Sequence, residues 1–137
     1  MMDESDPLSR LQALSQTGTF NNWLGLEVVA GRRQARSSYT CPGRPEFAQY
    51  HGFLHASIVG GLIDAARGFA AFSMSGEVMA SQFLVRCLRP AAADVFVVKG
   101  RVVKPRRRQI LAAAELLGLG APEKLFAVGD SILIPLA

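Results

Sequence analysis

Apolar side chains recur at helical spacing in two parts of the chain. The first part begins at Asp6-Pro7, a pair typical of a helix start, because Asp accepts hydrogen bonds from free amide groups and Pro fits the first helical turn. Three leucines follow on one face before Gly18. The second part covers about residues 55 to 73, and its apolar residues also share one face: Leu54, Ile58, Leu62, Ala65 and Phe69. The pattern predicts a short N-terminal helix and one long helix.

Six further segments have the composition of extended strands. Residues 23 to 29 and 34 to 40 are predicted to form a hairpin around a turn at residues 30 to 33. Residues 41 to 52, with two prolines and two glycines, predict an irregular loop that leads into the long helix. Four strands follow the long helix and are expected to pair as an antiparallel meander. They are predicted at residues 78 to 88, 94 to 104, 108 to 117 and 124 to 134.

Gly60 and Gly61 lie inside the predicted long helix, where each costs about 1 kcal/mol relative to Ala. This cost is explained if another backbone packs closely there, as a sheet wrapped around the helix would. The order of helix, two strands, long helix and four strands, without repeats or α/β alternation, indicates an α+β fold. We expect one domain over residues 1 to 137, with residues 1 to 19 as an N-terminal helical extension.

Composition argues against several classes of protein. Asp64 and Arg67 interrupt the longest apolar run, which therefore predicts a buried helix and not a membrane span. The first ten residues are acidic and polar, unlike a secretory signal, so we expect a cytoplasmic protein. Cys41 and Cys87 form no metal-binding motif, and the chain has only two histidines, so no disulfide, metal or cofactor is expected. The net charge of +4 suggests an anionic partner.

A motif at the start of the long helix carries a family resemblance. The stretch from Gln49 to Ser57, followed by Asp64, resembles the phenylacetic acid degradation (PaaI-like) branch of the hotdog-fold acyl-CoA thioesterases. That branch usually has Asn-x-x-Gly-x-x-His-Gly-Gly with an Asp nine residues after the His, and His55 and Asp64 keep this spacing. Here Gln49 replaces the Asn, and Ala56-Ser57 replaces the Gly-Gly. The resemblance covers about residues 20 to 135 and includes residues 83–91, 106–108 and 126–129.

The resemblance implies a hotdog fold, in which one long central helix is wrapped by a mainly antiparallel sheet of about six strands. It also implies an acyl-CoA thioesterase that hydrolyses an aryl- or medium-chain acyl-CoA to free acid and coenzyme A. In the family, the residues equivalent to Gln49 and Ala56 come from one chain and the Asp from the other. The protein is therefore expected to be a homodimer at least, and a tetramer by analogy. Family members often carry a hydroxyl residue that assists near the carboxylate, at Ser81, or at Ala80 if the register slips by one.

Thioester hydrolysis independently requires the chemistry that this motif offers. A carboxylate must attack the carbonyl or activate water, and a donor must face the oxyanion. Asp64, with apolar neighbours, is expected to have its pKa raised by desolvation, although an Asp that only bonds nearby backbone remains the alternative. The Ala56 N–H at the helix start suits the oxyanion. Because about 12 Å separates Ala56 from Asp64 along one helix, each site should combine two subunits.

The remaining candidates have weaker signals. The Gln49 amide can contact the substrate carbonyl or water, or be an exposed loop amide. His55 can donate to the thioester, but a His at a helix start more often bonds local backbone. The basic residues predicted to meet the coenzyme A phosphates are Lys99, Arg101, Lys104, Arg106, Arg107 and Arg108. Their alternative is a solvated edge that discourages aggregation, and nucleic-acid binding is disfavoured because aromatic residues do not interleave them.

Three functions compete at this stage. The first is the acyl-CoA thioesterase, with Asp64 as nucleophile or general base. The second is a hotdog protein that binds acyl-CoA without turnover, because Gln49 and Ala56 depart from the family motif. The third is a dehydratase or hydratase of a β-hydroxyacyl thioester, although such relatives use a His with an acidic partner in differently arranged motifs.

Overall fold

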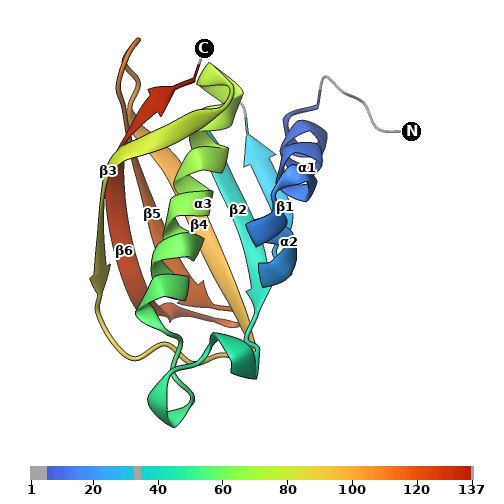
Figure 1. The fold of residues 1–137 in the computed structure, drawn as a ribbon, viewed down its shortest axis with the longest axis vertical. Coiled ribbons are helices and arrows are strands. Elements are labelled where there is room, and N and C mark those ends of the chain that lie inside the picture. The colour runs from blue at the N-terminus through green and yellow to red at the C-terminus, as the bar shows by residue number, and fades with distance from the viewer. Residues whose placement is uncertain (1–5, 33–34, 137) are drawn as a thin grey trace.

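The computed structural model describes residues 6–32 and 35–136, and Figure 1 shows one long helix lying against a curved sheet. The helix is α3 (Ala56–Ser75), close to the predicted range. The strands are β1 (Glu27–Arg32), β2 (Arg36–Pro42), β3 (Val78–Cys87), β4 (Val95–Lys104), β5 (Ile110–Gly118) and β6 (Ala121–Pro135). All neighbouring strands are antiparallel, in the order β1-β2-β4-β5-β6-β3. The predicted α+β class, with a six-stranded sheet around one helix, is confirmed.

The N-terminal helix α1 (Pro7–Thr17) is confirmed, and Asp6 caps it by accepting a hydrogen bond from the Ser9 N–H at 3.3 Å. The strand predicted from residue 23 is wrong at its beginning. Residues 23 and 24 end a second helix, α2 (Thr19–Leu24), and β1 starts only at Glu27. Gly25 causes the difference, because it takes a left-handed conformation (φ 70°) that terminates the helix inside an apolar run.

The predicted hairpin exists, but its turn differs. β1 continues through residues 30 to 32. Residue 33, the last of the predicted turn, and residue 34, the first of the predicted second strand, lie outside the described residues. The predicted irregular loop, residues 41–52, contains two short 3-10 helices, η1 (Pro45–Phe47) and η2 (Tyr50–Gly52).

The predicted four-strand meander is wrong for β3. β4, β5 and β6 are consecutive neighbours, but β3 pairs with β6 and lies at the edge of the sheet. The chain after β3 passes below the start of α3, where Ala91 O accepts from the Leu54 N–H at 2.9 Å, before it enters β4. Strands that follow one another in the sequence need not pair, because the connection between them can cross the sheet. The connection between β3 and β4 does so.

The core lies between α3 and the inner face of the sheet. Two hydroxyl groups of β2 donate to carbonyls of α3, Tyr39 to Leu62 O and Ser37 to Ala66 O, the latter at 2.8 Å. The backbones of α3 and the sheet approach each other closely at Gly100 on β4, where a Cβ would lie 2.2 Å from Ala66 O. These contacts fix the middle of α3 against the sheet.

The close approach of another backbone that was expected at Gly60 and Gly61 is wrong. A Cβ at Gly60 would meet nothing within 4 Å, and one at Gly61 would meet the Phe20 ring at 2.9 Å. Gly100, which admits the α3 backbone, belongs to the sheet.

Gly100→Ala is expected to lower the free energy of unfolding by about 3 kcal/mol, because the added methyl group must displace the α3 backbone. Urea unfolding followed by circular dichroism measures the change. Gly118→Ala on β5 is the matched control, since its Cβ would make only ordinary contacts at 3.5 Å or more. Equal stability of the two variants would contradict this account of the packing.

Candidate active site

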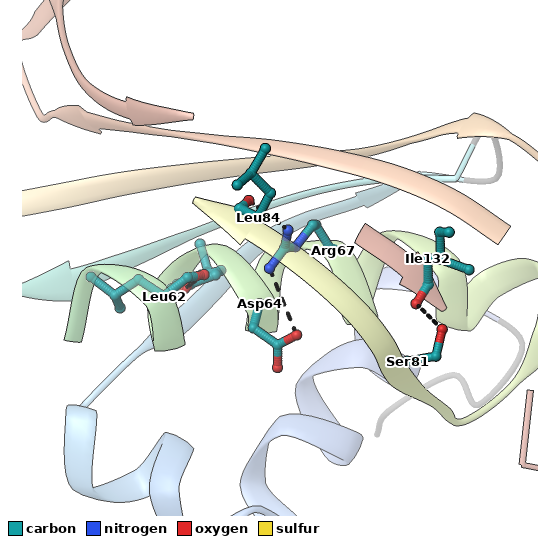
Figure 2. A network of polar contacts seen from close by, with 7 residues as sticks. Leu62, Asp64, Arg67, Ser81, Leu84 and Ile132 are labelled. Atoms are coloured by element: carbon teal, nitrogen blue, oxygen red, sulfur yellow. Dashed lines mark hydrogen bonds and ion pairs between the residues drawn. The ribbon is translucent and has the colours of Figure 1, made fainter. Parts of the chain in front are cut away.

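Asp64 lies in the middle of α3, and Figure 2 shows its carboxylate pointing away from the body of the sheet. Half of its side chain is exposed, whereas the sequence suggested a buried position. Partial burial nevertheless raises the pKa of Asp64 above its ordinary value, in the predicted direction, while the Arg67 guanidinium opposes the rise. Asp64 is thus a reachable carboxylate with an increased proton affinity.

Two positions beside Asp64 on the exposed surface of α3 are glycines and carry no side chain. Gly60 and Gly68 lie one turn before and one turn after it, on the same face of α3. A Cβ at either glycine would meet nothing within 4 Å. The face that presents the carboxylate therefore has room for a ligand or for another chain.

The start of α3 places Ala56 and His55 together. His55 is the N-cap, and its Nδ1 accepts from the Ser57 N–H at 3.0 Å, so the structural interpretation of His55 is correct in this respect. In a neutral imidazole the proton then lies on Nε2, which leaves that atom as a donor. Ala56 is exposed, has no positive φ, and its N–H meets no acceptor among the residues that the structure describes. Alanine therefore replaces the family glycine here without backbone strain.

Gln49 stabilises the loop that delivers the chain to this helix. Its side-chain amide donates to Leu54 O at 3.2 Å, and its backbone N–H donates to Phe53 O at 2.7 Å. The amide is thus directed at the residue immediately before His55, close to the start of α3. It remains on the exposed surface.

Arg67, one turn after Asp64, takes part in this site although sequence reasoning used it only as an interruption of an apolar run. Its side chain is completely buried, and its Nη2 lies 3.9 Å from Asp64 Oδ1. The signal was present in the sequence as a cation three residues after the candidate carboxylate, a spacing that brings two side chains together on a helix.

Comparisons with known proteins identify the fold. No protein-family model matches the sequence, and no curated protein matches it. Among solved structures, a thioesterase family protein from Silicibacter pomeroyi has 28% identity and a TM-score of 0.86, with 94% of this chain and 97% of that chain covered. The Escherichia coli PaaI protein from the phenylacetic acid degradation operon has 17% identity and a TM-score of 0.84, with 95% and 96% covered. The chain has the hotdog fold of the thioesterase superfamily.

A mutant form of the phenylacetic acid degradation protein PaaI from Thermus thermophilus has the same hotdog fold, at 22% identity and a TM-score of 0.77, with 87% of this chain and all of that chain covered. The resemblance to PaaI-like hotdog proteins stated from the sequence is therefore confirmed at the level of structure. Among the described residues of this hotdog chain, no helix combines the length and apolarity needed to span a membrane.

The hotdog fold groups some of the predicted site residues and separates others. Gln49, His55 and Ala56 lie together at the start of α3, and Asp64 lies two turns further along the same helix. Ser81 lies at a bulge of β3, and its hydroxyl donates to Ile132 O at 3.3 Å and not to Asp64 (Figure 2). One chain therefore does not bring all the predicted catalytic residues around one point.

The predicted basic residues fall into two groups. Lys104, Arg106, Arg107 and Arg108 are exposed at the connection from β4 to β5, which Figure 1 shows at the end of the sheet where α3 ends. Lys99 and Arg101 instead lie inside β4 and line a hollow of about 640 Å³ to which all six strands contribute residues. The lining of this hollow includes neither Asp64 nor Ala56. We keep the first group as the coenzyme A candidate.

Proposed function

We propose that this chain, as a single hotdog domain, is an acyl-CoA thioesterase that releases free acid and coenzyme A from an aryl- or medium-chain acyl-CoA. The observation that carries the proposal is Asp64, a half-exposed carboxylate with a raised pKa between two glycines on the exposed surface of the central helix. A raised pKa suits a group that must accept a proton or attack a carbonyl near neutral pH. The likeness to a thioesterase family protein at 28% identity supports this function.

In the proposed reaction, Asp64 attacks the thioester carbonyl or activates a water molecule that does so. The negative charge that develops on the carbonyl oxygen is stabilised by the Ala56 N–H, which points from the positive end of the α3 dipole. The Nε2–H of His55 and the amide of Gln49 lie beside the same helix start and assist in holding the carbonyl. The carbon–sulfur bond then breaks, and coenzyme A leaves as the thiol after taking a proton from Asp64 or from water. If Asp64 attacks directly, the acyl group is held as an anhydride on its carboxylate, and a water molecule then hydrolyses this anhydride to release the free acid and restore Asp64.

The site requires two chains, because Ala56 and Asp64 of one helix are about 12 Å apart. The edge strand β3 is the surface that we assign to the dimer. It leaves unpaired backbone groups along ten residues and exposes Met79, Phe83 and Leu84. Pairing there would cover the face of α3 that carries Asp64 and place Ala56 and Gln49 of one chain near Asp64 of the other. We further propose that two dimers form a tetramer.

We propose that the coenzyme A phosphates bind to four exposed basic residues, Lys104, Arg106, Arg107 and Arg108. Changing the three arginines to glutamine is expected to raise KM for an acyl-CoA about tenfold, with kcat nearly unchanged, because the contacts hold substrate and transition state equally. The effect should weaken at high salt. The matched control substrate is the same acyl group on N-acetylcysteamine, which lacks the phosphates and should show no change. An equal rise of KM for both substrates would argue against phosphate binding.

Release of free thiol from a panel of aryl- and aliphatic-acyl-CoA esters tests the function. Wild-type protein is compared with Asp64→Asn at matched folding, so that any contaminating thioesterase is subtracted. Asp64-dependent release supports a thioesterase and ranks its substrates. Release that is equal in both proteins would remove the proposal.

The second candidate is a hotdog protein that binds acyl-CoA without turnover. One observation favours it: the Gln49 amide, which replaces the family asparagine, donates to Leu54 O instead of standing free for a substrate. Calorimetric binding of acyl-CoA without thiol release would support this candidate, and sustained turnover would exclude it.

A further inference from the structure

Arg67 is an unusual residue for the interior of a small domain, because its side chain is completely buried and yet incompletely satisfied. Nη1 donates to Leu84 O on β3 at 3.4 Å. Nε and Nη2 are buried and have no hydrogen-bond partner among residues 6–32 and 35–136. A guanidinium loses its hydration on burial, so a protein that only needed to fill this space would be served better by an apolar side chain.

Three elements surround this guanidinium, and Figure 2 shows two of its neighbours, Asp64 and Leu84. On α3, Asp64 Oδ1 lies 3.9 Å from Nη2. On β3, the Phe83 ring centroid lies 5.5 Å from the guanidinium carbon. On β6, Gly129 leaves the space free, because a Cβ there would lie 2.6 Å from Leu84 O and 3.4 Å from Nη1. These neighbours direct the cation toward Asp64.

The charges around the pair act in opposite directions. Burial lowers the pKa of Arg67, but Asp64 and Asp130 on β6 oppose this, and an arginine stays cationic in proteins. Burial raises the pKa of Asp64, and Arg67 opposes that rise. Tyr39 on β2 also interacts with Asp64, but burial raises the pKa of Tyr39 well above its ordinary value, so it stays neutral. β3 contributes the Phe83 ring and the Leu84 carbonyl to the surroundings of the pair.

Half of the Asp64 side chain is exposed in a single chain, so water still stabilises its charge. A partner chain and an acyl group on this face would remove that water, and desolvation would then favour the protonated, inactive form. The buried Arg67 guanidinium, 3.9 Å from Asp64 Oδ1, would remain to oppose this protonation of Asp64.

We propose that Arg67 is a positioning residue, whose buried guanidinium keeps the Asp64 carboxylate ionised and oriented when the site is covered. This inference rests on the proposed thioesterase function for its catalytic meaning. The electrostatic pairing itself can be measured whether or not the protein hydrolyses a thioester.

The test is a titration of the Asp64 carboxyl carbon by ¹³C NMR in the intact protein, with Asp64→Asn identifying the resonance. Arg67→Met, which is unbranched and neutral, is expected to shift the midpoint to higher pH, whereas Arg67→Lys, which retains a charge, should shift it less. If Arg67→Met does not fold, Arg67→Gln carries the same comparison. On an acyl-CoA substrate, the acidic limb of kcat should move in parallel, with about a tenfold loss of kcat at pH values on that limb.

An unchanged Asp64 midpoint in the neutral variant would overturn the proposal, as would an equal shift in Arg67→Lys and Arg67→Met, since the charge would then have no role. A shifted midpoint without thiol release from any acyl-CoA would leave the pairing established and remove the thioesterase function instead. The experiment therefore distinguishes a failure of the Arg67–Asp64 pairing from a failure of the thioesterase function.

Discussion

Asp64→Asn is expected to lower kcat/KM for acyl-CoA hydrolysis about 10³-fold, the largest loss for any single substitution in this chain. Asparagine has nearly the same shape, so the helix and the exposed surface beside it should remain, but the amide neither accepts a proton nor attacks a carbonyl. Thiol release measures the rate, and acyl-CoA affinity by calorimetry should change little. Substantial activity in this variant would show that another group performs the chemistry.

The pH profile of wild-type protein follows from the same residue. Asp64 acts in its ionised form, and burial raises its pKa above the ordinary value, so kcat/KM should fall as the pH decreases through that raised pKa. Activity is thus fully present above the raised pKa and lost below it. The residual rate of Asp64→Asn should lack this acidic limb, and a limb that persists unchanged would contradict the assignment.

Ala56→Pro should produce the second largest effect, a fall in kcat of about 10² to 10³, because proline removes the N–H that faces the oxyanion. Ala56 is the first residue of α3, where proline is readily accepted. His55, with φ −64° and ψ 141°, already has the conformation that a residue before proline requires. The loss should therefore appear in kcat and not in stability.

Ala56→Gly is the matched control, since it keeps the N–H and introduces the residue that the family carries at this position. It should retain most of the activity. Equal losses in the proline and glycine variants would mean that the Ala56 side chain matters and its N–H does not.

The sequence pattern was sufficient to predict the helices and strands whose position depends on neighbouring residues. The Asp6 cap and the spacing of apolar residues predicted α1 and α3, and the composition of extended segments located β3 to β6 within a few residues. α2 was missed because the conformation of Gly25, not the apolar run, decides where the helix ends. The edge position of β3 was missed because strand pairing depends on the path of the whole connection, which no local pattern reports.

The same distinction applies to the candidate site. Asp64 and Ala56 could be predicted as candidates because a helix start and a carboxylate at fixed spacing are visible in the sequence. The burial of Arg67 beside Asp64 could not be predicted in the same way, since burial and unsatisfied nitrogens are properties of the packed structure. Gly100 is similar, because its contact with the α3 backbone joins segments far apart in the sequence.

Mixed dimers test most directly whether two chains build one thioesterase site. Asp64→Asn and Ala56→Pro chains carry different affinity tags, are inactive alone, and are combined by co-expression. If Ala56 of one chain works with Asp64 of the other, each mixed dimer contains one intact site, and a random mixture should recover about a quarter of the wild-type activity. Tandem-purified mixed dimers that release no thiol would contradict the two-chain site.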